Sequence, residues 1–251
     1  MSNSRYVREL RLQELDRALA VIPERQRILE IGAGAGWQAR RLSELGHQVE
    51  AVDLPDGAYL AERVWPIQNY DGINLPYATS SFDVVFSSNV LEHVASLPAL
   101  LQEVSRVVRP GGYQVHIVPS ATWRIWTTIT YYPTQVRRAL ALRENALESA
   151  ASALPQQHVK ARSEWRRITS RLLPPAHGLF GSMWSEVWHF QRRNWLHRLQ
   201  APSVENVKGS RGGFFYTGSV LLGEALPFKV RSLLSYVLGS STHVLVCKKR
   251  A

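Results

Sequence analysis

The sequence predicts an α/β domain in which helices cover both faces of a mostly parallel sheet. In the first half of the chain, short apolar segments of strand length alternate with segments of helical length, and a glycine-rich turn follows the first apolar segment. This alternation is typical of βαβ units, whose right-handed crossovers place helices on both faces of the sheet. The length of 251 residues and the 45% hydrophobic composition are sufficient for the core of such a domain.

The first half gives the clearest signals. A helix is expected over residues 5–21, where Leu10, Leu15 and Leu19 recur near helical spacing and Pro23 follows. The segments expected to form strands are RILEIGAG (27–34), HQVEAVDL (47–54), SFDVVFSSNV (81–90) and YQVHIVP (113–119). The segments expected to form helices between them are WQARRLSELG (37–46), AYLAERVW (58–65) and residues 98–108.

The pattern changes after Pro119. Residues 120–176 are predicted to be mostly helical, and they include a basic amphipathic helix at 159–173. Beyond them we expect a helix at 185–199, a short strand near 204–208, the loop GSRGG and a final strand at 242–249. The predicted organisation is therefore a core with an N-terminal helix (1–119), a helical lid insertion (120–176) and a C-terminal completion of the sheet (177–251).

Charge and composition narrow the class of protein. Residues 1–118 have a net charge of −3, whereas residues 119–251 have +13, together with six of the eight tryptophans. The basic half predicts contact with something anionic, although a solvated basic face is an equal alternative. A single cysteine, Cys247, excludes an intrachain disulfide framework and a cysteine-rich zinc site. No signal peptide or spanning segment is visible, so a cytoplasmic location is expected.

The turn from Glu30 to Gly36 reads Glu-Ile-Gly-Ala-Gly-Ala-Gly and is the segment that indicates a ligand-binding site. Glycines after a strand let backbone amides approach a ligand without a Cβ clash. A dinucleotide-binding turn, G-x-G-x-x-G, would have its third glycine at the position of Trp37. An acid at the strand end also suits a cationic ligand better than a pyrophosphate. The turn thus predicts a site for a positively charged nucleoside, with Gly36 serving close helix packing.

In this turn and in four later segments, the sequence resembles the class I S-adenosylmethionine-dependent methyltransferases, in particular their small-molecule, methyltransferase type 11-like branch. The resemblance covers about residues 25–119, through ILEIGAGAG, HQVEAVDL, DGINLPYATSSFD, SSNVLEHV and VVRPGGYQVHIVP. It implies a doubly wound, mostly parallel seven-stranded sheet of Rossmann-like type with a helical insertion. It also implies S-adenosyl-L-methionine as the cofactor.

The resemblance further implies which residues bind that cofactor. The glycine loop faces the methionine portion, Asp53 binds the ribose hydroxyls, and Asp71 borders the adenine amine. The complete set of expected cofactor-binding residues is Glu30, Gly32, Ala33, Gly34, Asp53, Leu54, Asp71, Gly72 and Asn89. No metal is expected in the site.

A sulfonium methyl group is already a good electrophile, so such an enzyme mainly aligns the acceptor and excludes water. A base is needed for a hydroxyl or carbon acid and much less for a free amine. The candidate bases are His93, His116, His177 and His189. His116 and His189 fit packing roles, and His93 with Glu92 fits a helix cap. We select His177, in the loop after the helical insertion, because ligands gather under loops at the carboxyl ends of strands.

Residues 120–176 occupy the place where this family usually keeps its substrate lid. Their Trp and Arg content suits an acceptor with an anionic part and an apolar part. The expected function is O-methylation of such a small or lipid-linked acceptor, for example a glycan, a lipid or a secondary metabolite. Peripheral contact with an anionic membrane surface is a further hypothesis. The oligomeric state is not indicated.

Two other functions remain open. A ribose-directed RNA methyltransferase fits the basic charge and the aromatic residues. Base methylation fits less well, because Cys247 lies in the last predicted strand and residues 89–92 lack an Asn/Asp-Pro-Pro-aromatic tetrad. An inactive methyltransferase-like scaffold is the third alternative, and the intact glycine loop, Asp53 and Asp71 argue against it.

Overall fold

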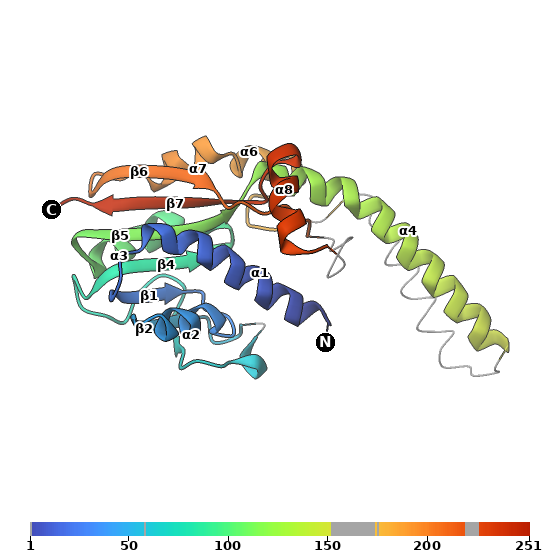
Figure 1. Ribbon diagram of the computed structural model, residues 1–251, viewed down its shortest axis with the longest axis horizontal. Coiled ribbons are helices and arrows are strands. Elements are labelled where there is room, and N and C mark those ends of the chain that lie inside the picture. Colours follow the sequence, from blue (N-terminus) through green and yellow to red (C-terminus); the bar gives the residue numbers. More distant parts are fainter. Residues whose placement is uncertain (1, 58, 152–173, 175, 219–225) are drawn as a thin grey trace.

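The computed structural model describes residues 2–57, 59–151, 174, 176–218 and 226–251 (Figure 1). Within them a seven-stranded sheet has the order β3-β2-β1-β4-β5-β7-β6. Strand β7 is antiparallel to both β5 and β6, and the other neighbouring pairs are parallel. The predicted doubly wound α/β fold is confirmed. The strands are β1 (Arg27–Ile31), β2 (Gln48–Asp53), β3 (Gln68–Asn69), β4 (Phe82–Ser88), β5 (Val108–Pro119), β6 (Val204–Arg211) and β7 (Thr242–Lys249).

Helices lie on both sides of the sheet, and α4 extends away from it in Figure 1. None of the helices in the described part of the chain combines the length and hydrophobicity needed to cross a bilayer. The α-helices are α1 (Ser2–Ala18), α2 (Trp37–Glu44), α3 (Leu97–Val107), α4 (Ala121–Ala151), α6 (Met183–His189), α7 (Arg192–Leu199) and α8 (Phe228–Leu238). Single 3-10 turns form η1 (Leu19–Val21), η2 (Leu60–Glu62) and η3 (Leu91–His93).

The alternation of side chains along the strands divides the core into two layers. On one face of the sheet, Ile28 and Val84 pack with Leu15 of α1 and Leu42 of α2. Figure 1 shows α1 crossing in front of the sheet on this side. On the other face, the neighbouring strand positions pack against α3 and α7, through Leu29, Val85, Leu245, Leu100, Val104, Trp195 and Leu199. Helices therefore enclose the sheet and leave its strand ends as the place for a site.

The helix expected at residues 58–65 is wrong, because only the turn η2 forms there among the described residues. The backbone N–H of Val64 donates to the carbonyl of Ala35 at 2.8 Å, which draws the chain away from helical geometry. Trp65 then packs on Gly36, where an added Cβ would lie 2.5 Å from the Trp65 Cβ. Pro66 follows and favours an extended residue before it. Tertiary contacts with the glycine turn therefore override the local helical pattern.

Two further predictions need correction. The helix expected at 185–199 is two helices, since Gln191 between them is extended and lets the fully buried rings of Phe190 and Trp195 stack at 6.1 Å. The strand expected near 204–208 continues to Arg211, so the GSRGG loop begins inside β6. The sequence did not indicate β3 or α8. The amphipathic helix predicted at 159–173 lies outside the described residues.

Candidate active site

A cavity of about 620 Å³ opens at the carboxyl ends of β1, β2 and β4. Nine of the ten site residues predicted from the sequence line this cavity, and Glu30 is the exception. These nine are Gly32, Ala33, Gly34, Asp53, Leu54, Asp71, Gly72, Asn89 and His177. The strand order arranges them along the edge of the sheet, from the residues after β3 and β2, through the loop after β1, to those after β4.

The glycine loop is held in a conformation that favours glycine. Gly32, Gly34 and Gly36 have φ angles of +69°, +58° and +79°. The N–H groups of Gly32 and Ala33 both donate to the carbonyl of Val52, at 2.9 and 3.2 Å. A Cβ on Gly32 would lie 2.3 Å from a methyl group of Val90, so this glycine also allows the loop after β4 to approach.

Asp53 ties the glycine loop to the end of β2. Its Oδ2 accepts the N–H of Gly34 at 2.6 Å, and its Oδ1 accepts the N–H of Leu54 at 2.7 Å. A carboxylate oxygen has two lone pairs, so each oxygen can still accept a second donor from the cavity. Leu54 beside it is 42% exposed and offers an apolar surface.

Asp71 shapes the loop after β3. Its carboxylate accepts the backbone N–H groups of Ile73 and Asn74 and the side-chain amide of Asn74, and these hydrogen bonds hold the pKa of Asp71 below its ordinary value. The turn brings Gly72, with φ +89°, to the cavity wall.

Asn89 follows β4 in a left-handed conformation, with φ +55°. Its backbone N–H donates to the carbonyl of Ile117 at 2.8 Å, which anchors the turn to β5.

Glu30 lies under the start of α2 rather than in the cavity wall. Strand alternation puts it on the same face as Ile28, which α1 and α2 cover. It is 2% exposed, and burial raises its pKa to about 8, against the opposing effect of a hydrogen bond with the Ala39 backbone. The carboxylate that lines the cavity is therefore Asp53, and Glu30 does not supply the negative charge there that the sequence suggested.

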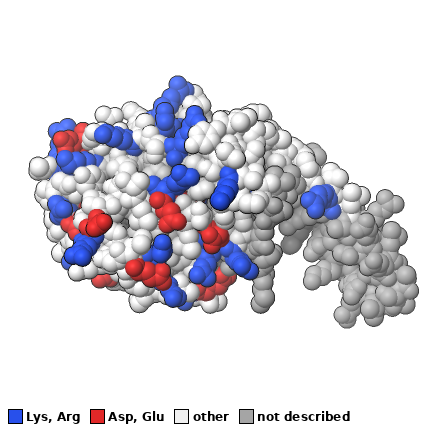
Figure 2. All heavy atoms as spheres, in the orientation of Figure 1, with Lys and Arg blue, Asp and Glu red and all other residues white. Residues whose placement is uncertain are grey.

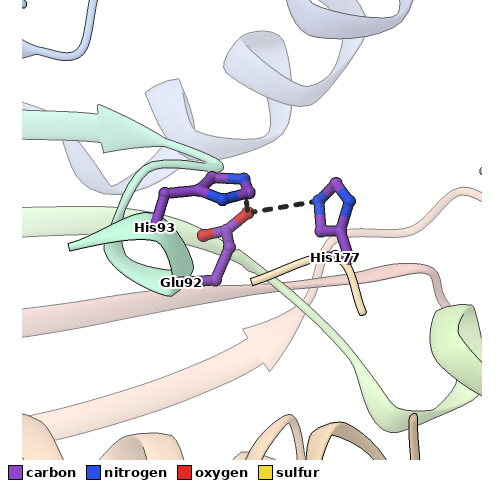
Figure 3. A group of neighbouring side chains, drawn as sticks. All are labelled: Glu92, His93 and His177. Atoms are coloured by element: carbon purple, nitrogen blue, oxygen red, sulfur yellow. Dashed lines mark ion pairs between the residues drawn. The ribbon is translucent and has the colours of Figure 1, made fainter. Parts of the chain in front are cut away.

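His177 meets His93 at the β4 side of the cavity, with ring centroids 4.9 Å apart (Figure 3). The indole of Trp123 lies against the His177 ring at 4.6 Å. Burial, together with the nearby His93, Arg124 and Arg11, lowers the pKa of His177 to about 4, so the ring is neutral at pH 7. Glu92 lies beneath both imidazoles and is fully buried.

The other candidate bases lie elsewhere. His116 is a core residue, as the sequence predicted: it is fully buried in β5, and its Nδ1 lies 2.8 Å from the Ser87 hydroxyl. His189 packs against Phe180 at the end of α6 and does not line the cavity.

The sequence did not indicate several cavity residues from other elements. Helix α1 contributes Val7 and Arg11, and the guanidinium of Arg11 pairs with the buried Glu14 at 2.6 Å. Tyr59 also lines the cavity and contacts Trp37 edge to face, with ring centroids 5.6 Å apart; Trp37, which the sequence left open between packing and the cofactor site, lines the cavity too. An Arg within an amphipathic helix reads as an ordinary surface residue, so only the fold reveals its position.

Comparison with known proteins decides the family. The sequence profile of the family described as a methyltransferase domain matches residues 4–177, which is more than half of the chain. The chain belongs to the class I S-adenosylmethionine-dependent methyltransferases. The cofactor of this family is S-adenosyl-L-methionine.

The methyltransferase resembles curated relatives over part of their length. It is 33% identical to a demethylmenaquinone methyltransferase of Corynebacterium urealyticum, over 53% of this chain and 56% of the relative. It is 36% identical to a malonyl-[acyl-carrier protein] O-methyltransferase of Erwinia pyrifoliae, over 34% of each chain. The matched part thus spans about half or less of these relatives.

Solved structures share the fold over nearly the whole chain. An S-adenosylmethionine-dependent methyltransferase from Mesorhizobium loti has a TM-score of 0.54 at 19% identity, covering 95% of this chain and 98% of that one. Another, from Archaeoglobus fulgidus, has a TM-score of 0.53 at 15% identity, covering 96% and 94%. At these low sequence identities, the structural likeness shows the fold alone.

Proposed function

We propose that this methyltransferase binds its cofactor along the sheet edge and methylates an oxygen of a small or carrier-linked acceptor, with His177 as the general base. The observation that carries the proposal is the order of the cavity residues. An adenosine would lie near Asp71 and Leu54, with its ribose on Asp53. Its amino-acid portion would lie along the glycine loop and Asn89, which directs the reacting end toward His93 and His177.

The residues present fit this cofactor. The cavity volume of about 620 Å³ lies within the range of about 300–1,000 Å³ for small-molecule sites. Asp53 keeps acceptor capacity for two hydroxyl donors, because its hydrogen bonds to the N–H groups of Gly34 and Leu54 use one lone pair of each oxygen. S-adenosylmethionine supplies an electrophilic methyl group when bound. The protein then has to orient the acceptor and take its proton.

His177 suits that second task because its position is fixed on two sides. The carboxylate of Glu186 accepts the backbone N–H groups of His177 and Gly178, at 2.6 and 2.7 Å. Trp123 packs against the ring itself. A neutral imidazole held at the cavity wall can accept the proton of an acceptor hydroxyl as the new oxygen–carbon bond forms.

Two observations support an acceptor with anionic and apolar parts. The names of the relatives give demethylmenaquinone for one and a malonyl group on acyl-carrier protein for another, so small and carrier-linked acceptors both occur among similar proteins. The net charge of +13 on residues 119–251 favours an anionic group. On the face in Figure 2, acidic side chains are interspersed among the basic ones.

Labelled cofactor tests this proposal even though the acceptor is unidentified. The purified protein is incubated with methyl-labelled S-adenosylmethionine and a fractionated cell extract, and label is followed into small molecules, lipids, carrier proteins and RNA. We expect label in a small-molecule, lipid-linked or carrier-protein fraction. Label confined to RNA would favour ribose methylation, and absence of both transfer and cofactor binding would favour a scaffold.

The role of His177 is tested with the same assay. His177→Gln should lower the transfer rate by about 10²–10⁴-fold, the usual contribution of a general base. His197→Gln is the matched control, because His197 is exposed on α7 and does not line the cavity. An undiminished rate in His177→Gln would rule out the base.

A further inference from the structure

Three potential metal ligands converge at the β4 side of the cavity. Glu92 and His93 come from the turn η3, whereas His177 comes from the loop before α6 (Figure 3). The Oε1 of Glu92 lies 3.8 Å from the Nε2 of His93 and 4.0 Å from the Nε2 of His177. The three ligand atoms all lie within 4.8 Å of one another. In Figure 3 the carboxylate points between the two rings.

Glu92 is the unusual member of this group. Its side chain has no exposed surface, and neither carboxylate oxygen has a hydrogen-bond partner among the described residues. Burying an unpaired carboxylate costs several kcal/mol, so such a group is paired, binds a metal or takes up a proton. The guanidinium groups in the neighbourhood are engaged with other acids, Arg11 with Glu14 and Arg124 with Glu186.

The two segments that carry these ligands are fixed to each other. The N–H of Leu179 donates to the carbonyl of Glu92 at 3.0 Å. A Cβ on Gly178 would lie 2.5 Å from that same carbonyl, so a glycine is needed for this close approach. With the Glu186 contacts to the backbone of His177, these bonds place the two imidazoles above one carboxylate before any ligand arrives.

We propose that Glu92, His93 and His177 form a binding site for one divalent transition-metal ion such as Zn²⁺, with an open coordination position facing the cavity. Two imidazoles and one carboxylate form a recognised ligand set for zinc and for non-haem iron. Ligand atoms around a tetrahedral zinc lie about 3.4 Å apart. The three ligand atoms, which are 3.8, 4.0 and at most 4.8 Å apart, would have to draw together by rotation of the side chains to reach that spacing. His93 and His177 line the cavity, so the fourth position is accessible to an acceptor oxygen.

This inference rests on the proposed O-methylation for its chemical consequence, but it assigns His177 a different role from the general base proposed above. With the ion bound, His177 is a ligand and is no longer free to take a proton. A bound ion would lower the pKa of an acceptor hydroxyl that coordinates it, and the hydroxyl proton would pass to water. The oxygen–methyl bond forms as the methyl–sulfur bond of the cofactor breaks. The site therefore selects an acceptor with a metal-binding oxygen.

Direct metal binding tests the site without cofactor or acceptor. The full chain is freed of metal with a chelator, the chelator is removed, and Zn²⁺ is titrated by calorimetry. The visible spectrum with Co²⁺ reports the coordination geometry. We expect one Zn²⁺ per chain with a Kd below about 1 µM. Glu92→Gln, His93→Ala and His177→Ala should each weaken binding at least about tenfold, and His197→Ala should leave it unchanged.

Two results would overturn the site: no Zn²⁺ binding by the wild-type protein at about 100 µM, or equal weakening by His197→Ala. His93→Ala is informative even if Glu92→Gln fails to fold, since the side chain of His93 is 47% exposed. Failure of the site is distinct from failure of the proposed function. A metal-free protein that still methylates, and loses activity in His177→Gln, retains the base and refutes the metal site.

Discussion

Replacing the carboxylate of Asp53 should weaken cofactor binding by a predictable amount. In Asp53→Asn, one carboxylate oxygen becomes an amide NH₂ group, which can no longer accept a hydrogen bond from a ribose hydroxyl. A hydrogen bond to a charged group contributes about 1.5–3 kcal/mol. At about 1.4 kcal/mol for each factor of ten, its loss raises the Kd about 10- to 100-fold. The N–H of Gly34 or of Leu54 also loses its acceptor, which costs about 1–3 kcal/mol of folding stability.

The assay for Asp53→Asn is calorimetric titration with S-adenosylhomocysteine, which binds without reacting, accompanied by thermal denaturation to measure stability. Asp56→Asn is the matched control, because Asp56 is exposed three residues further along and does not line the cavity. Binding by Asp53→Asn as tight as that of the wild-type protein, or equal weakening in Asp56→Asn, would refute this role of Asp53.

Two further predictions concern stability. Burial lowers the pKa of His116 to about 4, so the folded protein favours the neutral ring and its free energy of unfolding falls as the pH drops from about 6.5 to 4. In urea denaturation over that range, the wild-type protein should lose about 3 kcal/mol more of this free energy than His116→Gln, and parallel curves would contradict the prediction. Gly32→Ala should destabilise the protein more than Gly46→Ala: both have positive φ, at a cost of about 1–2 kcal/mol, but only Gly32 would also place a Cβ 2.3 Å from Val90. Equal losses in thermal denaturation would show that the loop after β4 moves away at little cost.

The sequence predicted the central strands and the sheet-edge site because both depend on local patterns. Short apolar runs ending in glycine or acid marked β1 and β2. The carboxyl ends of neighbouring parallel strands lie at one edge of the sheet, so Gly34 and Asp53 were expected together and are hydrogen-bonded at 2.6 Å. The glycine turn and the position of Asp53 at a strand end both predict the same edge of the sheet.

The sequence could not predict features that depend on distant contacts. His93 and His177 are neighbours only because the loop before α6 pairs with the Glu92 backbone. Strand β3 has two exposed residues, Gln68 and Asn69, and hence no hydrophobic pattern. Glu30 was expected in the cavity because it is close to the glycine loop in sequence. That expectation neglected the alternation of side chains along the strand, which puts the Glu30 side chain on the α2 face.

The most direct test is a crystal structure of the protein bound to S-adenosylhomocysteine. We predict that the ribose hydroxyls contact Asp53, that the adenine lies near Leu54 and Asp71, and that the sulfur faces His177. A ligand bound outside this cavity, or one whose sulfur faces away from His177, would contradict the central claim that the sheet edge aligns the cofactor with the histidine side of the cavity.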